Sequence, residues 1–143
     1  MIVLVQATVL TVGLDGQNKA LEELPIQLVT MQSGVEAARS FKNKDVDSVI
    51  SKWDLDDMAD GLFLRRLKTI KPDIPTIAIV KSGDWAQEIA ARSLGVSAVI
   101  SDDADDDFFR ETVANLLGLA ETVSIRAISG SPSDRFGTRK ATL

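Results

Sequence analysis

The chain contains neither histidine nor cysteine, and these two absences exclude several classes of chemistry. Without cysteine there is no disulfide scaffold, no thiolate metal site and no thiol nucleophile. Without histidine the chain lacks the commonest general base, the commonest transition-metal ligand and any Ser-His-Asp triad. Most routes to an enzyme are therefore closed, and we expect neither catalytic residues nor a cofactor.

Long hydrophobic runs and an excess of positive charge are also missing. The apolar start, residues 1–14, is too short to cross a bilayer and is interrupted by Gln6, Thr8 and Thr11. The first basic residue is Lys19, so the basic region of a secretory signal is absent. The net charge of −5 argues against nucleic-acid binding. We expect a cytoplasmic protein that binds neither membrane nor nucleic acid.

The residues that are present suit one folded domain, because 45% of the 143 residues are hydrophobic. Short apolar runs predict strands at residues 2–5, 26–29, 49–50, 76–80 and 97–100. Helical spacing predicts helices at residues 14–24, 34–42, 61–70, 85–94 and 108–119. This alternation predicts parallel βαβ units with helices on both faces of one sheet. The first segment is ambiguous, because Gly13 and Gly16 disfavour a helix and leave a hairpin through residues 9–12 as the alternative.

The composition changes near residue 121. Residues 121–143 are rich in Ser, Thr and Gly and hold four basic and two acidic residues. Residues 1–120 hold 12 basic and 19 acidic residues. We expect an acidic folded domain over residues 1–120 and a flexible basic tail over residues 121–143.

Three stretches of the chain resemble the receiver domain of bacterial response regulators. The segment DSVISKWDLDDMADGLFLRRL, residues 47–67, is similar to the third strand of a receiver, its following loop and its third helix. The segment IPTIAIV, residues 74–80, is similar to the fourth strand of a receiver. The segment ARSLGVSAVIS, residues 91–101, is similar to the end of the fourth helix followed by the fifth strand. The resemblance covers residues 1–119 and implies a flavodoxin-like (βα)5 fold, a doubly wound five-stranded parallel sheet of order 2-1-3-4-5.

The positions that carry phosphotransfer in this family hold other residue types here. Gln6 and Ala7 replace the acidic pair, and Lys52 or Trp53 replaces the phosphoacceptor aspartate. Val80 replaces the hydroxyl residue, and Asp102 replaces the invariant lysine. Receiver phosphorylation needs a carboxylate nucleophile, Mg²⁺ held by carboxylates, and a lysine with a hydroxyl. The resemblance is therefore to a pseudo-receiver without the phosphorylation residues. Lys52 and Asp102 form either a swapped ion pair at the strand ends or two separate solvated charges.

Aspartates are concentrated in two expected loops, residues 54–60 and 102–107. Hard cations prefer such oxygen ligands, and the candidates for a divalent site are Asp54, Asp56, Asp57 and Asp103. Aspartates also cap helix N-termini, and the spacing does not match a calcium-binding loop, so we expect capping and no metal. Trp53 and Trp85 follow strand ends, where they either stack on a ligand or pack against the core.

In receivers, the fourth helix, the fifth strand and the fifth helix form the surface for dimers and partner proteins. The candidate interface residues at the matching positions are Trp85, Glu88, Arg92, Val99, Phe109 and Arg110. We therefore expect a phosphorylation-independent protein-interaction module of bacterial signalling or cell organisation, without an output domain, whose partner is another protein or a second copy. The alternative is a sensor of divalent cations or small ligands at the acidic carboxyl edge of the sheet.

Overall fold

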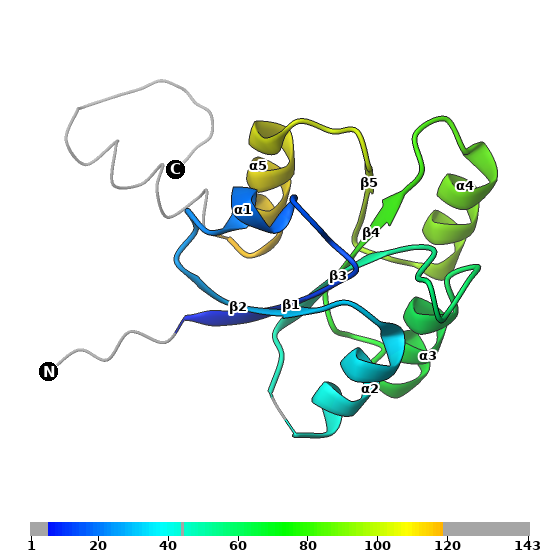
Figure 1. Ribbon diagram of the computed structural model, residues 1–143, viewed down its shortest axis with the longest axis horizontal. Helices are drawn as coiled ribbons and strands as arrows, with labels where there is room; N and C mark the ends of the chain where they lie inside the picture. Colours follow the sequence, from blue (N-terminus) through cyan, green and yellow to red (C-terminus); the bar gives the residue numbers. More distant parts are fainter. Residues whose placement is uncertain (1–5, 44, 119–143) are drawn as a thin grey trace, which may run out of the picture.

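The computed structural model describes residues 6–43 and 45–118, which alternate between strands and helices (Figure 1). The strands are β1 (Ala7–Val12), β2 (Ile26–Met31), β3 (Ser48–Lys52), β4 (Thr76–Val80) and β5 (Ala98–Ser101). The helices are α1 (Asn18–Leu21), α2 (Gly34–Asn43), α3 (Leu62–Ile70), α4 (Trp85–Leu94) and α5 (Asp106–Leu116). Among these described residues, no helix has the length and apolar character needed to cross a membrane.

The strands form one parallel sheet in the order β2-β1-β3-β4-β5, which confirms the expected topology. All five residues of β4 are buried, as a strand covered on both faces requires. The order reverses between β1 and β3, and in such sheets ligand-binding groups gather in the loops at the carboxyl ends of the strands.

Helices cover both faces of the sheet and enclose two hydrophobic cores (Figure 1). One core lies under α2, α3 and α4 and includes Leu10, Phe63 and Leu67. The other lies under α1 and α5 and includes Val9 and Phe109. Val9 and Leu10 face opposite cores because successive strand side chains point to opposite faces.

The expected position of the first strand is wrong for the sheet as observed. Residues 2–5 lie outside the described residues, and β1, which pairs with both β2 and β3, spans Ala7–Val12. The pairing is parallel throughout, so a hairpin through residues 9–12 is wrong as well. The strand ends before Gly13, whose φ of +74° turns the chain and whose N–H donates to the Met31 carbonyl.

The remaining elements differ from expectation mainly at their ends. The expected helix over residues 14–24 is reduced to the four residues of α1, because the turn begins at Gly16 and Pro25 follows closely. The α5 helix spans Asp106–Leu116 instead of residues 108–119. The ranges of α4 and β4 agree with the prediction. The predicted basic tail over residues 121–143 lies outside the described residues.

Candidate functional site

The carboxyl edge of the sheet is formed by the loops that follow β1, β3, β4 and β5. Three of the four segments expected there, residues 52–57, 80–83 and 101–103, do lie at this edge. The fourth, Gln6 and Ala7, does not, because Ala7 is the first residue of β1. The next residue, Thr8, exchanges hydrogen bonds with Asp47, which precedes β3. Gln6 and Ala7 are therefore at the amino edge, opposite to the expected place.

The positions that follow β1 are Gly13, Leu14 and Asp15. Gly13 has no side chain, and Leu14 is buried in the α1–α5 core at 1% exposure. Asp15 is exposed. The run that ends before Gly13, a glycine with positive φ, forms β1.

Lys52 is the last residue of β3 and pairs in register with Ile79 of β4. Its aliphatic stem lies along Gly13, since a Cβ built on that glycine would stand 3.5 Å from Lys52 Cδ. Trp53, the next residue, is only 3% exposed and packs in the core under α3. The Arg65 guanidinium lies 5.5 Å from the centre of the Trp53 ring. Trp53 is therefore a core residue, as one of the two expectations held.

The hypothesised Lys52–Asp102 ion pair is wrong. Within the described part of the chain, the ion pairs are Arg92–Glu88, Arg110–Glu23 and Arg110–Asp107. The Asp102 carboxylate instead accepts a hydrogen bond from the backbone N–H of Ser82 at 3.0 Å. A backbone donor of the neighbouring loop has thus taken the place that the ammonium of Lys52 was expected to fill.

The aspartates after β3 bind backbone and side-chain donors of the protein. Asp57 accepts hydrogen bonds at 2.9 Å from the N–H groups of Gly34 and Val35, at the start of α2. These two bonds hold the pKa of Asp57 below its ordinary value. Asp54 accepts hydrogen bonds from the Asp60 N–H at 2.6 Å and from Gln87 Nε2 at 2.7 Å. Capping was expected of these aspartates, and Asp57 performs it for a helix that precedes it by more than 20 residues.

The aspartates after β5 are used in the same way. The hydroxyl groups of Ser101 and Ser82 donate to Asp103 and lower its pKa. Asp105 caps α5 by accepting from the Phe108 N–H, which confirms the expected capping role.

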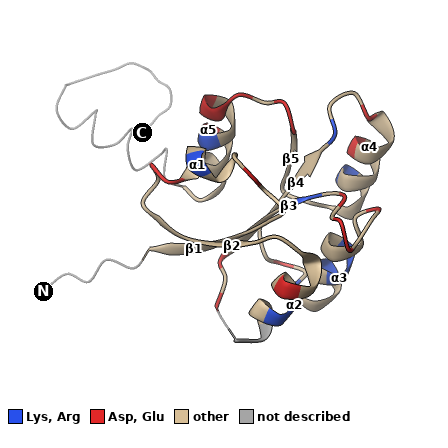
Figure 2. Ribbon diagram, in the orientation of Figure 1, with Lys and Arg blue, Asp and Glu red and all other residues tan. Residues whose placement is uncertain are grey.

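The divalent-site candidates are not arranged as a metal site. Among residues 6–43 and 45–118, no three His, Cys, Asp or Glu side chains form a group that could hold an ion. Asp54, Asp57 and Asp103 bind protein donors, and Asp56 is exposed in the β3–α3 loop. Figure 2 shows the acidic residues along the β3–α3 and β5–α5 loops. The sensor alternative therefore gains no support from their geometry.

A small cavity of about 110 Å³ lies between the start of α4 and β5. It is lined by Val80, Lys81, Gly83, Asp84, Trp85, Glu88, Arg92, Val99 and Ser101. Four expected interface residues, Trp85, Glu88, Arg92 and Val99, are in this lining. At 72% exposed, Trp85 is not the core residue that was the alternative expectation. One turn further along α4, Ile89 is 63% exposed. We call Trp85, Glu88, Ile89, Arg92 and Val99 the α4–β5 surface.

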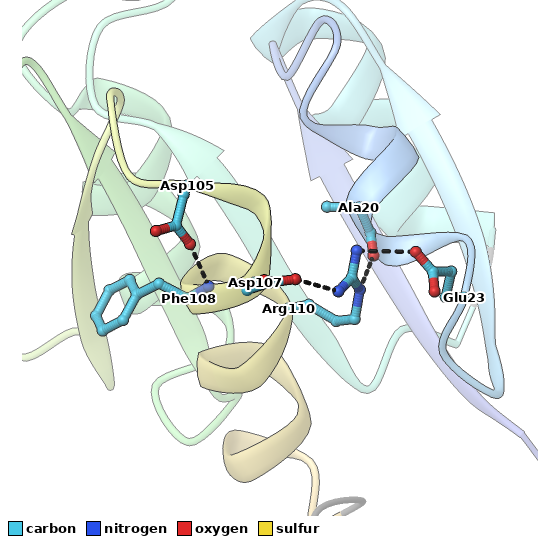
Figure 3. Close-up of polar contacts among 6 residues, drawn as sticks. All are labelled: Ala20, Glu23, Asp105, Asp107, Phe108 and Arg110. Atoms are coloured by element: carbon cyan, nitrogen blue, oxygen red, sulfur yellow. Dashed lines mark hydrogen bonds and ion pairs between the residues drawn. The ribbon is translucent and has the colours of Figure 1, made fainter.

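Two expected interface residues, Phe109 and Arg110, lie elsewhere. Phe109 is 1% exposed and fills the α1–α5 core. Arg110 reaches α1 and the turn after it, where it donates to the Ala20 carbonyl and to Glu23, both at 2.8 Å (Figure 3). The residue that sequence reasoning missed is Phe108, which is 53% exposed and projects from α5 away from Arg110 (Figure 3). Consecutive helix residues are about 100° apart, so only one of two adjacent phenylalanines can enter the core.

Comparisons with known proteins agree with this architecture. No protein-family model matches the chain. The transcriptional regulatory proteins GlrR of Escherichia coli K12 and QseF of Escherichia coli O157:H7 are each 27% identical to it over 90 residues. The match covers 63% of this chain and 20% of each relative, so the chain spans about a fifth of the length of these curated proteins.

Two solved structures match over nearly their whole length. The signal receiver domain of an HD domain-containing protein from Pseudomonas fluorescens Pf-5 has a TM-score of 0.71 and 20% identity, covering 82% of this chain and 98% of that one. The chemotaxis response regulator CheY4 of Vibrio cholerae has a TM-score of 0.69 and 14% identity, covering 78% and 99%. The chain therefore has the CheY-like, flavodoxin-like fold of response regulator receiver domains.

Proposed function

We propose that this chain is a receiver-type domain of bacterial two-component signalling that acts by binding a protein partner, without being phosphorylated. The observation that carries the proposal is Lys52 at the end of β3, where the receiver resemblance expects the phosphoacceptor aspartate. The carboxyl ends of β1 and β4 support it, because Gly13, Leu14 and Val80 supply neither carboxylate nor hydroxyl there.

The chemistry of phosphotransfer explains why these residues matter. A lysine at the end of β3 forms no acyl phosphate, and its positive charge opposes a bound Mg²⁺. The carboxylate of Asp102 stands where an ammonium group would neutralise the phosphoryl oxygens, and it repels them instead. The next carboxylate after Lys52 belongs to Asp54, whose two oxygens accept hydrogen bonds from Asp60 and Gln87. Both oxygens of Asp54 are therefore used in hydrogen bonds that stabilise the β3–α3 loop.

The α4–β5 surface is the proposed partner-binding surface. Exposed tryptophans are costly to leave in water and are enriched among residues that dominate binding energy. Trp85 is 72% exposed, and Ile89 adds a second apolar side chain one turn along α4. The Glu88–Arg92 ion pair, at 3.1 Å, supplies a polar rim. The partner is a protein, either another chain or a second copy of this one.

Treatment with beryllofluoride and Mg²⁺, followed by amide NMR, tests the phosphorylation half of the proposal. We expect no shift change at residues 52–61 or 80–84, while a receiver domain with the full set of phosphotransfer residues responds under the same conditions. A stable adduct in the wild-type chain that disappears in Asp54→Asn would overturn the proposal.

Two isoleucines of similar exposure test the binding half. Ile89, on the α4–β5 surface, is 63% exposed, and Ile70, at the end of α3, is 68% exposed. We expect Ile89→Ser to weaken partner capture or self-association at least tenfold and Ile70→Ser to leave it unchanged. Sedimentation equilibrium measures self-association, and affinity capture with quantitative mass spectrometry measures the other partners. Equal effects of the two variants would remove the α4–β5 surface from the proposal.

A further inference from the structure

The β4–α4 loop, residues 81–84, is tied on one side to the β3–α3 loop through a single glutamine. Gln87 Nε2, in the first turn of α4, donates to Asp54 Oδ2 at 2.7 Å. Gln87 Oε1 accepts from the Lys81 N–H at 2.8 Å. The Gln87 N–H also donates to the cap carboxylate of Asp84 at 3.0 Å. A carboxylate only accepts and a backbone N–H only donates, so the side-chain amide has one orientation that satisfies both partners.

On its other side the same loop is tied to the residues that follow β5. The Ser82 N–H donates to Asp102 Oδ1 at 3.0 Å, and Ser82 Oγ donates to Asp103 Oδ2 at 2.9 Å. Asp103 is held in turn by the Ser101 hydroxyl. Gln17, before α1, donates to the Asp102 carbonyl at 3.3 Å and extends the connection to the loop after β1. We call the central six residues the carboxyl-edge belt: Asp54, Lys81, Ser82, Gln87, Asp102 and Asp103.

Within the β4–α4 loop, the Asp84 N–H donates to the Lys81 carbonyl at 3.0 Å, and the belt connects this turn to the neighbouring loops. Gly83, at its tip, has a φ of +80° and no atom within 4 Å of the place where a Cβ would stand. Lys81 and Ser82 are exposed. Hydrogen bonds to carboxylates are stronger than those between neutral groups. Asp102 and Asp103 bind Ser82 of the loop directly, whereas Asp54 reaches Lys81 only through the side-chain amide of Gln87. Displacing the loop therefore requires contacts to both neighbouring loops to break together.

We propose that the carboxyl-edge belt is a conformational lock that holds the β4–α4 loop, and the exposed start of α4, in one position. The functional role of the lock rests on the proposed function, because it would hold the α4–β5 surface in one conformation for its partner, with no phosphorylation switch to change it. The lock itself is a property of the free chain. It makes Gln87 and Ser82 positioning residues for Trp85, which takes part in none of the four hydrogen bonds among the belt residues.

Amide hydrogen exchange of the full chain, measured by NMR without any partner, tests the lock. In the wild type we expect the Lys81 and Ser82 amides to exchange well below the rate of an unstructured peptide, despite their exposure. Gln87→Met keeps the length and helix propensity of the side chain and removes both of its polar contacts. We expect it to accelerate exchange at Lys81 about tenfold, the effect of losing one hydrogen bond. Gln32→Met, in the β2–α2 loop, is the matched control and leaves both amides unchanged.

A second variant keeps the test independent of α4. Asp102→Ala removes the acceptor of the Ser82 N–H, so exchange at Ser82 rises about tenfold while the amides of β1 keep their wild-type rates. If the wild-type loop amides exchange like an unstructured peptide, or if neither variant changes them, the lock is refuted whatever the chain binds. If the amides respond as expected and no partner engages the α4–β5 surface, the lock stands and the proposed function fails.

Discussion

Replacing Gly61 by alanine tests how the loop after β3 is shaped. Gly61 precedes α3 with a φ of +72°, and its N–H donates to the Trp53 carbonyl at 2.9 Å. A Cβ on this glycine would stand 2.4 Å from two carbon atoms of the Trp53 indole, which is 3% exposed and rigid. The loop that carries Asp54 and Asp57 thus depends on close contact between a glycine and a buried ring.

Two costs add in this variant. A left-handed conformation costs a non-glycine residue about 1–2 kcal/mol. Overpacking a filled core against a ring that cannot retreat costs about 1–3 kcal/mol more. We expect Gly61→Ala to lower the free energy of unfolding by about 2–5 kcal/mol, a large share of the roughly 5–15 kcal/mol typical of a domain.

Gly95 is the matched control, because it ends α4 with a φ of +91° and has no atom within 4 Å of its Cβ position. Gly95→Ala should lose only the conformational cost of about 1–2 kcal/mol. Urea unfolding followed by circular dichroism gives both values, and the difference between them measures the ring contact. Equal losses in the two variants would refute the argument that Trp53 excludes a side chain at Gly61.

Two further predictions concern contacts between elements. Asp57→Ala removes the acceptor for the N–H groups of Gly34 and Val35, so the free energy of unfolding at pH 7 should fall by about 1 kcal/mol, the usual value of a helix cap. The folded-state pKa of Asp57 is lowered, so its stabilising contribution is complete at pH values above the ordinary pKa of about 3.9 and is lost as the pH falls through the folded-state pKa. Urea unfolding at pH 7 and in more acid solution should therefore show the stabilities of wild type and variant converging as the pH falls. Arg110→Met removes the hydrogen bonds and ion pair between α5 and the α1 segment, and should lower the free energy of unfolding by about 1–2 kcal/mol. The Arg92 side chain is 61% exposed, so Arg92→Met should lower it by less than about 0.5 kcal/mol in the same urea experiment.

The elements that sequence reasoning located well are those with local boundaries. The run TIAIV of β4 is apolar apart from Thr76 and follows Pro75, so its ends are visible in the chain itself. The α4 helix begins after the capping aspartate Asp84 and ends at Gly95, and both signals are local. The first strand lacked such signals, since residues 2–5 and 7–12 are both rich in aliphatic or β-branched side chains, with only Gln6 between them. The choice is made by pairing with β2 and β3, which a window of neighbouring residues does not contain.

The candidate site shows a similar division. The positions of Lys52 and Val80 followed from the strands that contain them, and Trp85, Glu88, Arg92 and Val99 do lie together around one cavity. Phe109 and Arg110 were misplaced because the helical phase of α5 depends on which of two phenylalanines the α1–α5 core accepts. That choice is made by the packing of α1 against α5, and no local rule decides it.

The concentration of aspartates at the carboxyl edge has a physical explanation that requires no bound cation. In a parallel α/β sheet the helices begin at this edge, so the free backbone N–H groups of their first turns gather there. Asp57, Asp84 and Asp105 each accept from such a group, at the starts of α2, α4 and α5. Once the carboxylates serve donors within the protein, binding a cation would cost those bonds. Asp54 and Asp102 are further acceptors at the same edge, and they bind donors of the β4–α4 segment. The carboxylates of this edge therefore cap the helices and also connect the neighbouring loops by hydrogen bonds.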